Sequence, residues 1–570
     1  MSTSFTFRSR IILAGILIFS LVLVGKLFFV QIVHSATYSQ SADRQYATPA
    51  DDIYERGTIF FESKDGQLIS AAAQTAGYKA AINPGKLKDA EDVYKKLSGI
   101  ITLEHEDFIS KAKKTDDPYE EVANHLGKDQ ADKISALKIP GVNIFKEKWR
   151  FYPGGTLAAH TLGLVGYKGA ELGGRYGLER FYDRELTRNN NNPYVNFFAE
   201  IFSNINRSIF ESEVKEGDVV TTIEPEVEGF LENKLAEVKE RYAVDSIGGI
   251  IMNPMDGSIY AMGSWPNFDP NDFSGVKKSS TFSNPLVENV LEFGSVVKPL
   301  VMAAALDAGV VTAQTTYTDR GSVIVEKKEI FNFDKKARGP GTSMQEVLSQ
   351  SLNTGMVFVE QKLGRARLKE YLLSFGIKDK TGIDLPNETS GLVSNLNSPR
   401  EIEFANAAFG QGIALTPVEM IRALASLGNG GNLVVPHVVR KIVYADGTSQ
   451  EKKYETTRAK ITNETSEAIT SMMVTVMDKA IKGGLGKLDR FSVAVKTGTA
   501  QVADNTTGGY YEDRHNHSFV GYFPAYDPQF IVFLYAINPK GVRYASETWS
   551  DPFLDITKFL LNYYEVPPDR

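Results

Sequence analysis

The sequence of 570 residues contains no cysteine, which excludes disulfide bonds, thiol catalysis and metal sites built from cysteine. Its seven histidines are scattered, and only His515 and His517 stand close together. A zinc site needs at least three well-placed ligands, so we expect no metal and interpret these two as polar surface residues. Long basic stretches are also missing and the net charge is −7, which argues against nucleic acid as a partner.

A long apolar run stands near the N-terminus, where Arg8 and Arg10 precede the uninterrupted stretch from Ile11 to Gly25. With the Lys26 side chain reaching to the interface, residues 11–33 approach the length that crosses a bilayer. The flanking arginines predict that residues 1–10 are cytoplasmic and that the rest lies outside the cell membrane. The alternative is a cleaved signal peptide, because Val33-His-Ser35-Ala36 would suit a signal peptidase.

A chain of this length is too long for one hydrophobic core, so we expect two or more domains. Residues 36–210 mix short strands with polar helices, and residues 86–147 within them indicate charged amphipathic helices. A polar loop at 187–193 has no packing role that the sequence assigns. Residues 211–245 predict a linker and a helix that begins near Glu224, residues 246–563 a second domain, and residues 564–570 a loose tail.

Three short polar motifs follow one another in the second half of the chain. They are Ser295-Val-Val-Lys298, Ser351-Leu-Asn353 and Lys496-Thr497-Gly498-Thr499. In this order they supply a nucleophile, a base, a proton relay and a carboxylate anchor, which is what an acyltransferase with an active-site serine needs. A single short motif is weak evidence, and a second Lys-Thr-Gly at Lys380 lies in a charged loop without strand alternation, so we discount it.

The first motif opens a predicted buried helix. Gly294 precedes it, Pro299 stands in its first turn, and the apolar run that follows ends near Gly309. Ser295 and Lys298 are three residues apart, which puts their side chains on one helix face. A neutral lysine can take the hydroxyl proton, and burial and the helix dipole both lower its pKa. The backbone N–H of Ser295 is a candidate oxyanion donor.

The second motif reads as a turn that leads into an apolar helix. The Ser351 hydroxyl and the Asn353 amide are positioned by this pattern to pass a proton to a leaving amine and to hold the substrate backbone. A plain helix N-cap is the alternative interpretation, because serine and asparagine are favoured there.

The third motif lies in a β-rich run, where strand spacing puts Ser492, Ala494 and Lys496 on one face. Gly498 allows a ligand to approach the backbone closely. Lys496 and the hydroxyls of Thr497 and Thr499 are candidates for holding a substrate carboxylate, and the Thr499 N–H for the second oxyanion donor.

These motifs and their surroundings resemble the class B penicillin-binding proteins. The likeness extends over nearly the whole chain, through residues 249–262, 409–417, 429–431 and 518–524 and, upstream, through segments that begin at Arg56, Arg150 and Gly177. The chain departs from the family pattern in three places. Phe61-Glu62 replaces an Asp-Arg pair, Phe293 stands where proline is common, and Leu352 stands where a second serine is common. We expect the last two to reshape the pocket and weaken β-lactam binding.

The resemblance implies an α/β (α+β) fold of the penicillin-binding protein and serine β-lactamase type. Residues 246–563 would be the transpeptidase domain, carried on a pedestal (dimerisation) domain at 36–210 with a transmembrane anchor at 11–33. It implies a peptidoglycan D,D-transpeptidase in which Ser295 attacks the D-Ala–D-Ala carbonyl of a stem peptide and a neighbouring stem amine accepts the acyl group. β-Lactams would acylate the same serine, and no metal or organic cofactor is needed.

Other readings remain open at this stage. A serine β-lactamase shares the motifs but lacks a pedestal, and a bifunctional enzyme with a glycosyltransferase domain is disfavoured because residues 36–210 resemble a pedestal. A non-catalytic scaffold or β-lactam sensor would keep the fold. Within the family, residues 376–388 favour a role in septal synthesis at division over elongation of the lateral wall. Either role implies a membrane-embedded glycan polymerase and other divisome or elongation proteins as partners.

Overall fold

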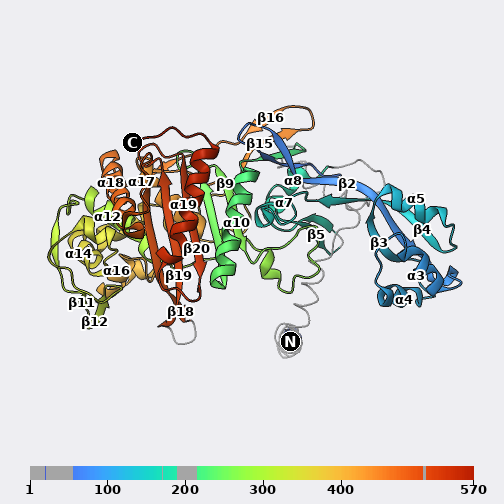
Figure 1. Cartoon of the computed structure of the whole chain (residues 1–570), viewed down its shortest axis with the longest axis horizontal. Coiled ribbons are helices and arrows are strands. Elements are labelled where there is room, and N and C mark those ends of the chain that lie inside the picture. Colours follow the sequence, from blue (N-terminus) through green and yellow to red (C-terminus); the bar gives the residue numbers. More distant parts are fainter. Residues whose placement is uncertain (1–18, 21–22, 24–54, 170, 189–214, 505–508) are drawn as a thin grey trace, which may run out of the picture.

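The computed structural model describes residues 19–20, 23, 55–169, 171–188, 215–504 and 509–570. Figure 1 shows an elongated molecule with a large C-terminal domain at one end and a smaller head, carried on a long strand, at the other. The predicted span at 11–33 lies almost entirely outside the described residues, as does most of the polar loop at 187–193. Within the part of the chain that is described, no helix combines the length and the apolar character that crossing a membrane requires.

The pedestal is built on a mixed sheet with the strand order β16-β15-β7-β1-β2-β3, and β4 also pairs with β2. Its strands are β1 (Ile59–Glu62), β2 (Leu68–Ile82), β3 (Glu120–Leu126), β4 (Val142–Phe151), β7 (Gly217–Thr221), β15 (Val439–Tyr444) and β16 (Ser449–Glu451). Two features differ from expectation. β2 runs for 15 residues where short strands were predicted, and β15 and β16 come from the stretch assigned to the second domain. The sheet therefore joins the two domains.

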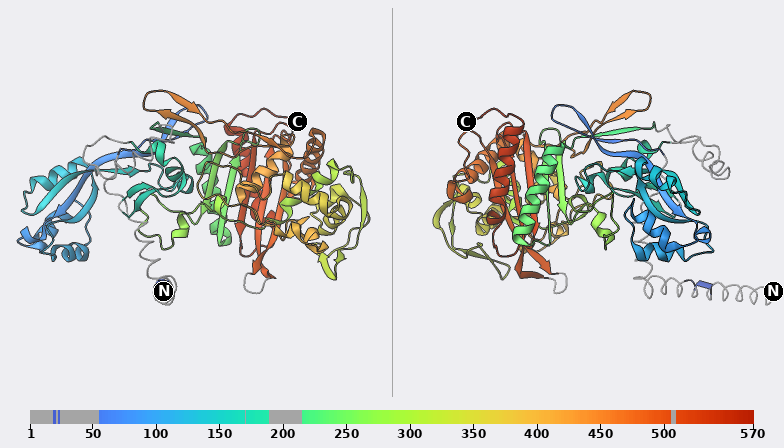
Figure 2. Two further views of the ribbon diagram at one scale, coloured as in Figure 1. Left: turned by 180° about the vertical axis from the view of Figure 1, so that it is seen from behind. Right: turned by 45° about the vertical axis from the view of Figure 1, so that its right-hand side comes forward.

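The head of the pedestal has a small core of its own. Helices α3 (Ala90–Ser98), α4 (His105–Ala112) and α5 (Lys128–Ala136) are the amphipathic helices that the sequence predicted. Their apolar residues Val93, Leu97, Phe108 and Ile134 are buried together with Ala80 of β2. Figure 2 shows this head from behind and in a view turned by 45°, separated from the C-terminal domain.

The second domain is built on a five-stranded antiparallel sheet in the order β18-β19-β20-β8-β9. These strands are β18 (Ala494–Asp504), β19 (Gly509–Phe523), β20 (Phe530–Ile537), β8 (Ser246–Met252) and β9 (Ile259–Trp265). The predicted hairpin at 249–262 corresponds to β8 and β9. Six of the seven residues of β8 are buried, because helices cover both faces of the sheet.

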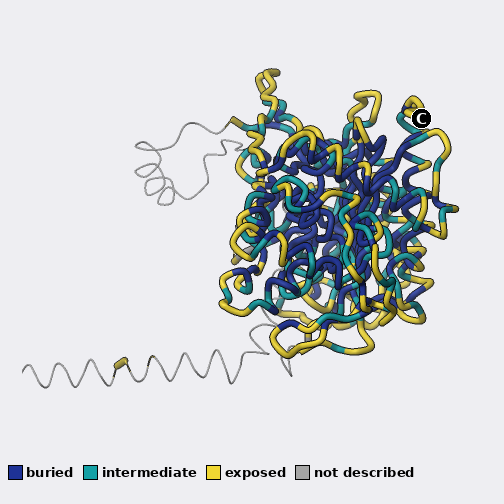
Figure 3. The backbone as a smooth tube through the Cα atoms, turned by 90° about the vertical axis from the view of Figure 1, so that its left-hand side faces the viewer, coloured by how far each residue is buried: buried dark blue, intermediate teal, exposed yellow. Residues whose placement is uncertain are grey.

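The covering helices are α10 (Pro225–Tyr242) and α19 (Ala545–Tyr563) on one face, and α17 (Pro417–Gly428) and α18 (Asn463–Lys479) on the other. The predicted helix near Glu224 is α10, whose first turn is capped because Glu224 Oε2 accepts from Val227 N at 2.8 Å. Figure 3 shows buried backbone concentrated in the interior of the molecule and exposed backbone at its loops.

The remaining elements surround the sheets. The helices are α6 (Ala159–Leu162), α7 (Gly177–Phe181), α8 (Asp183–Leu186), α11 (Pro285–Glu288), α12 (Lys298–Asp307), α13 (Met344–Ser349), α14 (Asn353–Leu363), α15 (Arg365–Ser374) and α16 (Glu401–Ala407). The short strands are β5 (Val165–Lys168), β6 (Glu171–Gly174), β10 (Thr316–Asp319), β11 (Ser322–Val325), β12 (Lys328–Phe331), β13 (Gly339–Ser343), β14 (Asn432–Leu433) and β17 (Thr457–Arg458).

The C-terminal residues are bound to the second domain, so the prediction of a loose tail at 564–570 was wrong. Val566 is 7% exposed, and Asp569 accepts hydrogen bonds from the backbone and hydroxyl of Ser492. Arg570 forms an ion pair with Asp478 at 2.7 Å. These contacts tie the end of the chain to the segment just before β18.

Candidate active site

The nucleophile candidate sits on a tight turn that precedes a buried helix. Residues Gly294–Val297 form one turn of 3-10 helix, and α12 then begins at Lys298 with Pro299 in its first turn. Gly294 has φ +63°, and a Cβ there would meet the Thr499 carbonyl oxygen at 3.0 Å. A larger residue would therefore be disfavoured both by its backbone conformation and by this close contact. The predicted helix is confirmed, with Ser295 in its 3-10 lead-in rather than in the α-helix itself.

Lys298 is fully buried and its amine points to the second motif. Its Nζ lies 2.7 Å from the Ser351 carbonyl oxygen and 2.8 Å from Asn353 Oδ1, which can accept the two N–H groups of a neutral amine, and 3.3 Å from Ser351 Oγ. Burial, with a smaller contribution from the nearby Lys496, holds the pKa of Lys298 well below its ordinary value. In the described part of the chain no hydrogen bond joins this amine to Ser295 Oγ. A neutral Lys298 is thus available as a base.

The second motif forms a strained turn before α14. Ser351 adopts φ +54°, the left-handed region that a residue with a side chain rarely occupies. Leu352 stands at the cap position of α14 and no side chain caps that helix, so the N-cap interpretation of Ser351 and Asn353 was wrong. Asn353 Nδ2 donates to the Phe331 carbonyl oxygen at 2.9 Å. The turn therefore presents its polar groups to Lys298 instead of to its own helix.

The third motif lies on β18, the edge strand of the five-stranded sheet. The Ser295 turn packs against β18, where a Cβ at Gly498 would meet Phe293 O at 2.4 Å and Ser518 Oγ at 2.3 Å. Glycine is needed at this position because the two backbone segments and a side chain leave no room for a methyl group. This close approach sets Thr499 beside the nucleophile turn, where its N–H stays the predicted second oxyanion donor.

Lys496 completes a three-way contact at the second motif. Its Nζ donates to Ser351 Oγ at 3.0 Å and to Thr497 O at 2.8 Å. Burial lowers the pKa of Lys496 to about 7. Two ammonium groups that share one hydroxyl repel each other, so the arrangement favours one protonated and one neutral lysine. Because burial and Lys496 both act on Lys298, the neutral one is Lys298.

The motifs meet at a cavity of about 860 Å³. It is lined by the predicted residues Ser295, Ser351, Asn353, Lys496, Thr497 and Thr499, while Gly498 stands behind them in the strand. Ser295 is half-buried and its hydroxyl has no hydrogen-bond partner among the described residues. Thr499 Oγ1 accepts from Ala545 N at 3.1 Å, so its hydroxyl proton can still be donated to a ligand. The discounted Lys380 does not line this cavity.

Two departures from the family pattern lie outside the cavity lining. Phe293 is 1% exposed and packs edge-on against Phe533, with ring centroids 5.0 Å apart. Leu352 is fully buried. Both side chains turn into the apolar core, so neither touches a ligand in the cavity, and the expectation that they weaken β-lactam binding stays a prediction.

The two neighbouring histidines both lie on β19 and differ in burial. His515 lines the cavity, whereas His517 is fully buried, with Nδ1 2.8 Å from Thr548 Oγ1 and Nε2 3.1 Å from Arg543 O. The prediction of polar surface residues was wrong for His517. Among the described residues no cluster of three or more metal-ligating side chains occurs.

Several residues that line the cavity carried no sequence signal. Phe333 and Tyr544 pack edge-on with ring centroids 5.4 Å apart, and Arg338, Glu512 and Arg543 also line the cavity. They come from loops and element ends, where single residues have no periodicity or motif that would mark them.

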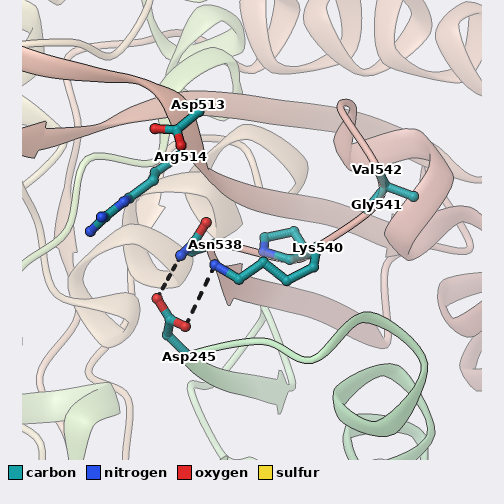
Figure 4. Close-up of a pocket in the computed structure, with 8 residues that line it drawn as sticks. Asp245, Asp513, Arg514, Asn538, Lys540, Gly541 and Val542 are labelled. Carbon is teal, nitrogen blue, oxygen red and sulfur yellow. Dashed lines mark hydrogen bonds and ion pairs between the residues drawn. The ribbon is translucent and has the colours of Figure 1, made fainter.

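A second, smaller hollow of about 500 Å³ lies beyond the loop that follows β20. Figure 4 shows Asp245 between Asn538 and Lys540, with Arg514 nearby. Asn538 Nδ2 donates to Asp245 at 2.7 Å and Lys540 Nζ lies 3.8 Å from the same carboxylate. Asp245 and Lys540 are exposed and pair with each other, and we assign the hollow no chemical role.

Comparison with known proteins matches both domains. The family model described as the penicillin binding protein transpeptidase domain matches residues 247–557, and that of the penicillin-binding protein dimerisation domain matches residues 54–222. The chain is 28% identical to stage V sporulation protein D of Bacillus subtilis, over 96% of this chain and 84% of that protein. It is 25% identical to the peptidoglycan D,D-transpeptidase FtsI of Buchnera aphidicola, over 97% of this chain and 94% of that protein.

Solved structures share the fold. Penicillin-binding protein 3 of Mycobacterium tuberculosis in complex with aztreonam superposes with a TM-score of 0.68 at 20% identity, over 91% of this chain and 98% of that chain. Penicillin-binding protein 2X of Streptococcus thermophilus gives a TM-score of 0.70 at 21% identity, over 90% of this chain and 80% of that chain.

Proposed function

The chain belongs to the penicillin-binding protein transpeptidase family and is a serine-type peptidoglycan D,D-transpeptidase, and we propose that Ser295 is its nucleophile. The observation that carries this assignment is the fully buried Lys298. Its amine is hydrogen-bonded to Ser351 and Asn353. Lys298 follows Ser295, the half-buried serine that lines the cavity, by three residues. An amine kept neutral at such a place serves as a base for the neighbouring hydroxyl.

We assign each step to a group on the support of this geometry. Ser295 Oγ attacks the D-Ala–D-Ala carbonyl while its proton passes to neutral Lys298, and the N–H groups of Ser295 and Thr499 bind the developing oxyanion. Ser351, in contact with both amines, relays a proton to the departing nitrogen, and the terminal D-Ala leaves. An amine of a neighbouring stem peptide then attacks the ester, gives its proton back through Lys298, and restores the Ser295 hydroxyl.

The same groups explain capture by β-lactams. The ring amide replaces the peptide bond, its C–N bond opens on attack, and the departing nitrogen stays tethered to the acyl group. Ser295 is left as an ester. Lys496 and the Thr497 and Thr499 hydroxyls would hold the carboxylate that donor peptides and β-lactams both carry.

The test uses the full chain with a fluorescent penicillin, beside a Ser295→Ala variant, and records intact masses. A stable adduct that is present on the wild type and absent on the variant supports the assignment. An intact penicillin with no adduct on folded wild type would refute it. Penicillin consumed without an adduct would point to a hydrolase.

Location and cellular role belong to the same proposal. We propose that residues 11–33 anchor the chain in the cell membrane in a single pass, with the N-terminus cytoplasmic, on the support of the apolar run and its flanking arginines. Protease added to intact spheroplasts should then digest the catalytic domain and spare a tag on the N-terminus. Digestion of the tag would contradict this topology.

We further propose septal synthesis, with a membrane-embedded glycan polymerase and other division proteins as partners, because residues 376–388 resemble the division type. A fluorescent fusion should gather at the division site. A fusion spread along the side wall would support the elongation role instead.

A further inference from the structure

A buried carboxylate lies behind the cavity wall and belongs to none of the three motifs. Asp319, at the end of β10, is 1% exposed. Its Oδ1 accepts from Thr354 Oγ1 at 2.8 Å, from Gly321 N at 3.0 Å and from Asn332 Nδ2 at 3.0 Å. Its Oδ2 accepts from Arg338 N at 2.9 Å and again from Asn332 Nδ2 at 3.0 Å. This number of donors satisfies a buried carboxylate and lowers its pKa.

The donors belong to the segments that frame the second motif. On one side, Thr354 directly follows Asn353, and its backbone N–H donates to Asn332 Oδ1 at 3.2 Å. Asn332 in turn follows Phe331, whose carbonyl oxygen holds the Asn353 amide at 2.9 Å. Asp319 thus binds both the residue after Asn353 and the loop that orients the Asn353 side chain.

On the other side, the contact runs through Arg338. Asp319 fixes the Arg338 backbone, and the Arg338 side chain donates from Nε to Gln350 Oε1 at 2.9 Å. Gln350 directly precedes Ser351. The Ser351-Leu-Asn353 turn is therefore held at both ends by segments that meet at one carboxylate.

The turn needs such support because its conformation is strained. Ser351 at φ +54° occupies a region that costs an ordinary residue energy. A strained turn persists when its surroundings fix it, and relaxes when they loosen. Relaxation here would move the Ser351 carbonyl and the Asn353 side chain away from Lys298 Nζ, which they now contact at 2.7 and 2.8 Å.

We propose that Asp319 is a positioning residue that holds the Ser351-Leu-Asn353 turn against Lys298. This inference rests on the proposed function, because it assigns Asp319 a role in the acylation of Ser295. Asp319 does not line the cavity, so it acts through the turn and touches no substrate.

A pH signature follows from the surroundings of Lys298. The charged group that faces this amine is Lys496 of β18, while Arg338 and Tyr317 are the titratable groups beside Asp319. If the turn loosens, water reaches Lys298 and the burial that lowers its pKa is relieved. A neutral base works above its pKa, so the acid limb of the acylation profile would move to higher pH.

The experiment compares the full-length wild type with Asp319→Asn and with Asp384→Asn as a matched control. Asp384 is also buried, at 3% exposed, and accepts from Val438 N and Val439 N away from the cavity. The measurement is the second-order rate constant of acylation by a fluorescent penicillin at several pH values between 6 and 9. We expect Asp319→Asn to slow acylation about 10- to 100-fold, the scale of a small misplacement of catalytic groups, and to move the acid limb upward.

The control variant should keep the acid limb of the wild type. The proposal would be overturned if the acylation rate constants of Asp319→Asn matched those of the wild type at every pH. It would also be overturned if they were lower by the same factor at every pH, because that pattern indicates fewer folded molecules. Wild type that is not acylated at all would refute the proposed function instead. Should Asp319→Asn not fold, Thr354→Val removes one donor and must show the same upward shift, and Thr354→Ser must restore the wild-type profile. A Thr354→Val profile that matches wild type would overturn the proposal.

Discussion

Replacement of Lys298 by methionine should abolish function without destabilising the fold. Methionine keeps the apolar stem of the side chain and lacks the amine that we propose as the base. Acylation should fall by about 100-fold or more, the usual contribution of a positioned general base. Ser295 itself stays in place, because its 3-10 turn precedes the substituted residue and Gly294 anchors it against β18.

The effect on stability follows from the burial of the amine. At pH 7 the unfolded chain carries a protonated Lys298, and the folded protein must remove that proton because burial lowers the pKa. The removal costs about 4 to 5 kcal/mol, given the ordinary pKa of lysine. Against this stand the two hydrogen bonds that the N–H groups of a neutral amine can donate, to Ser351 O and Asn353 Oδ1. At about 0.5–1.5 kcal/mol each they do not exceed the cost, so the variant should be at least as stable as the wild type.

The sign of the pH dependence provides the decisive check. A lysine whose pKa is lowered by folding binds fewer protons in the folded state than in the unfolded state. The wild type therefore gains stability as pH rises toward the ordinary pKa, by about 1.4 kcal/mol per pH unit. The variant lacks this term, so its advantage at pH 7 should shrink by pH 9.

The assay is unfolding of the transpeptidase domain in denaturant at pH 7 and pH 9, for the wild type and the variant. A variant that is less stable by the same amount at both pH values would refute the reasoning, because Lys298 would then titrate alike in the folded and unfolded chain. Unchanged acylation would equally refute its role as the base.

Three further predictions follow. Gly498→Ala should slow acylation by penicillin at least about 10-fold, because a methyl group would meet Ser518 Oγ at 2.3 Å and misplacing catalytic groups is costly. The variant should still unfold cooperatively. An unchanged acylation rate would contradict this prediction. Glu179→Gln should destabilise the pedestal by about 3–5 kcal/mol in thermal unfolding, since Glu179, fully buried, bridges two buried arginines at 2.7 and 2.6 Å; a shift near zero contradicts it. Ser351→Gly should raise stability by about 1 kcal/mol through relief of its left-handed backbone while acylation is lost; a destabilised variant would argue against strain.

Much of the site could be predicted because its candidate residues lie in short motifs with local helix and strand signals. The glycine before Ser295 and the proline after Lys298 mark a helix start, and the alternation around Lys496 marks a strand. The structure confirms a helix at Lys298–Asp307 and a strand at Ala494–Asp504. Local sequence patterns were enough to predict these two elements, because the apolar residues of each one are spaced with the period of a single type of secondary structure.

Other predictions failed where burial in three dimensions decided the outcome. His517 looked like a surface histidine and is enclosed by Thr548 and Arg543. Strand β15 pairs with β7 across more than 200 positions of sequence, a pairing that no local pattern specifies.

The sequence by itself identified the candidate catalytic residues and the kind of element on which each one lies. Only the tertiary structure decided that the amines of Lys298 and Lys496 meet at one hydroxyl of Ser351, the second across 145 positions of the chain. It alone placed Asp319 behind the turn that holds this hydroxyl. The reason is physical: hydrogen bonds, burial and pKa shifts depend on distance in space, and periodicity reports only neighbours along one helix or strand.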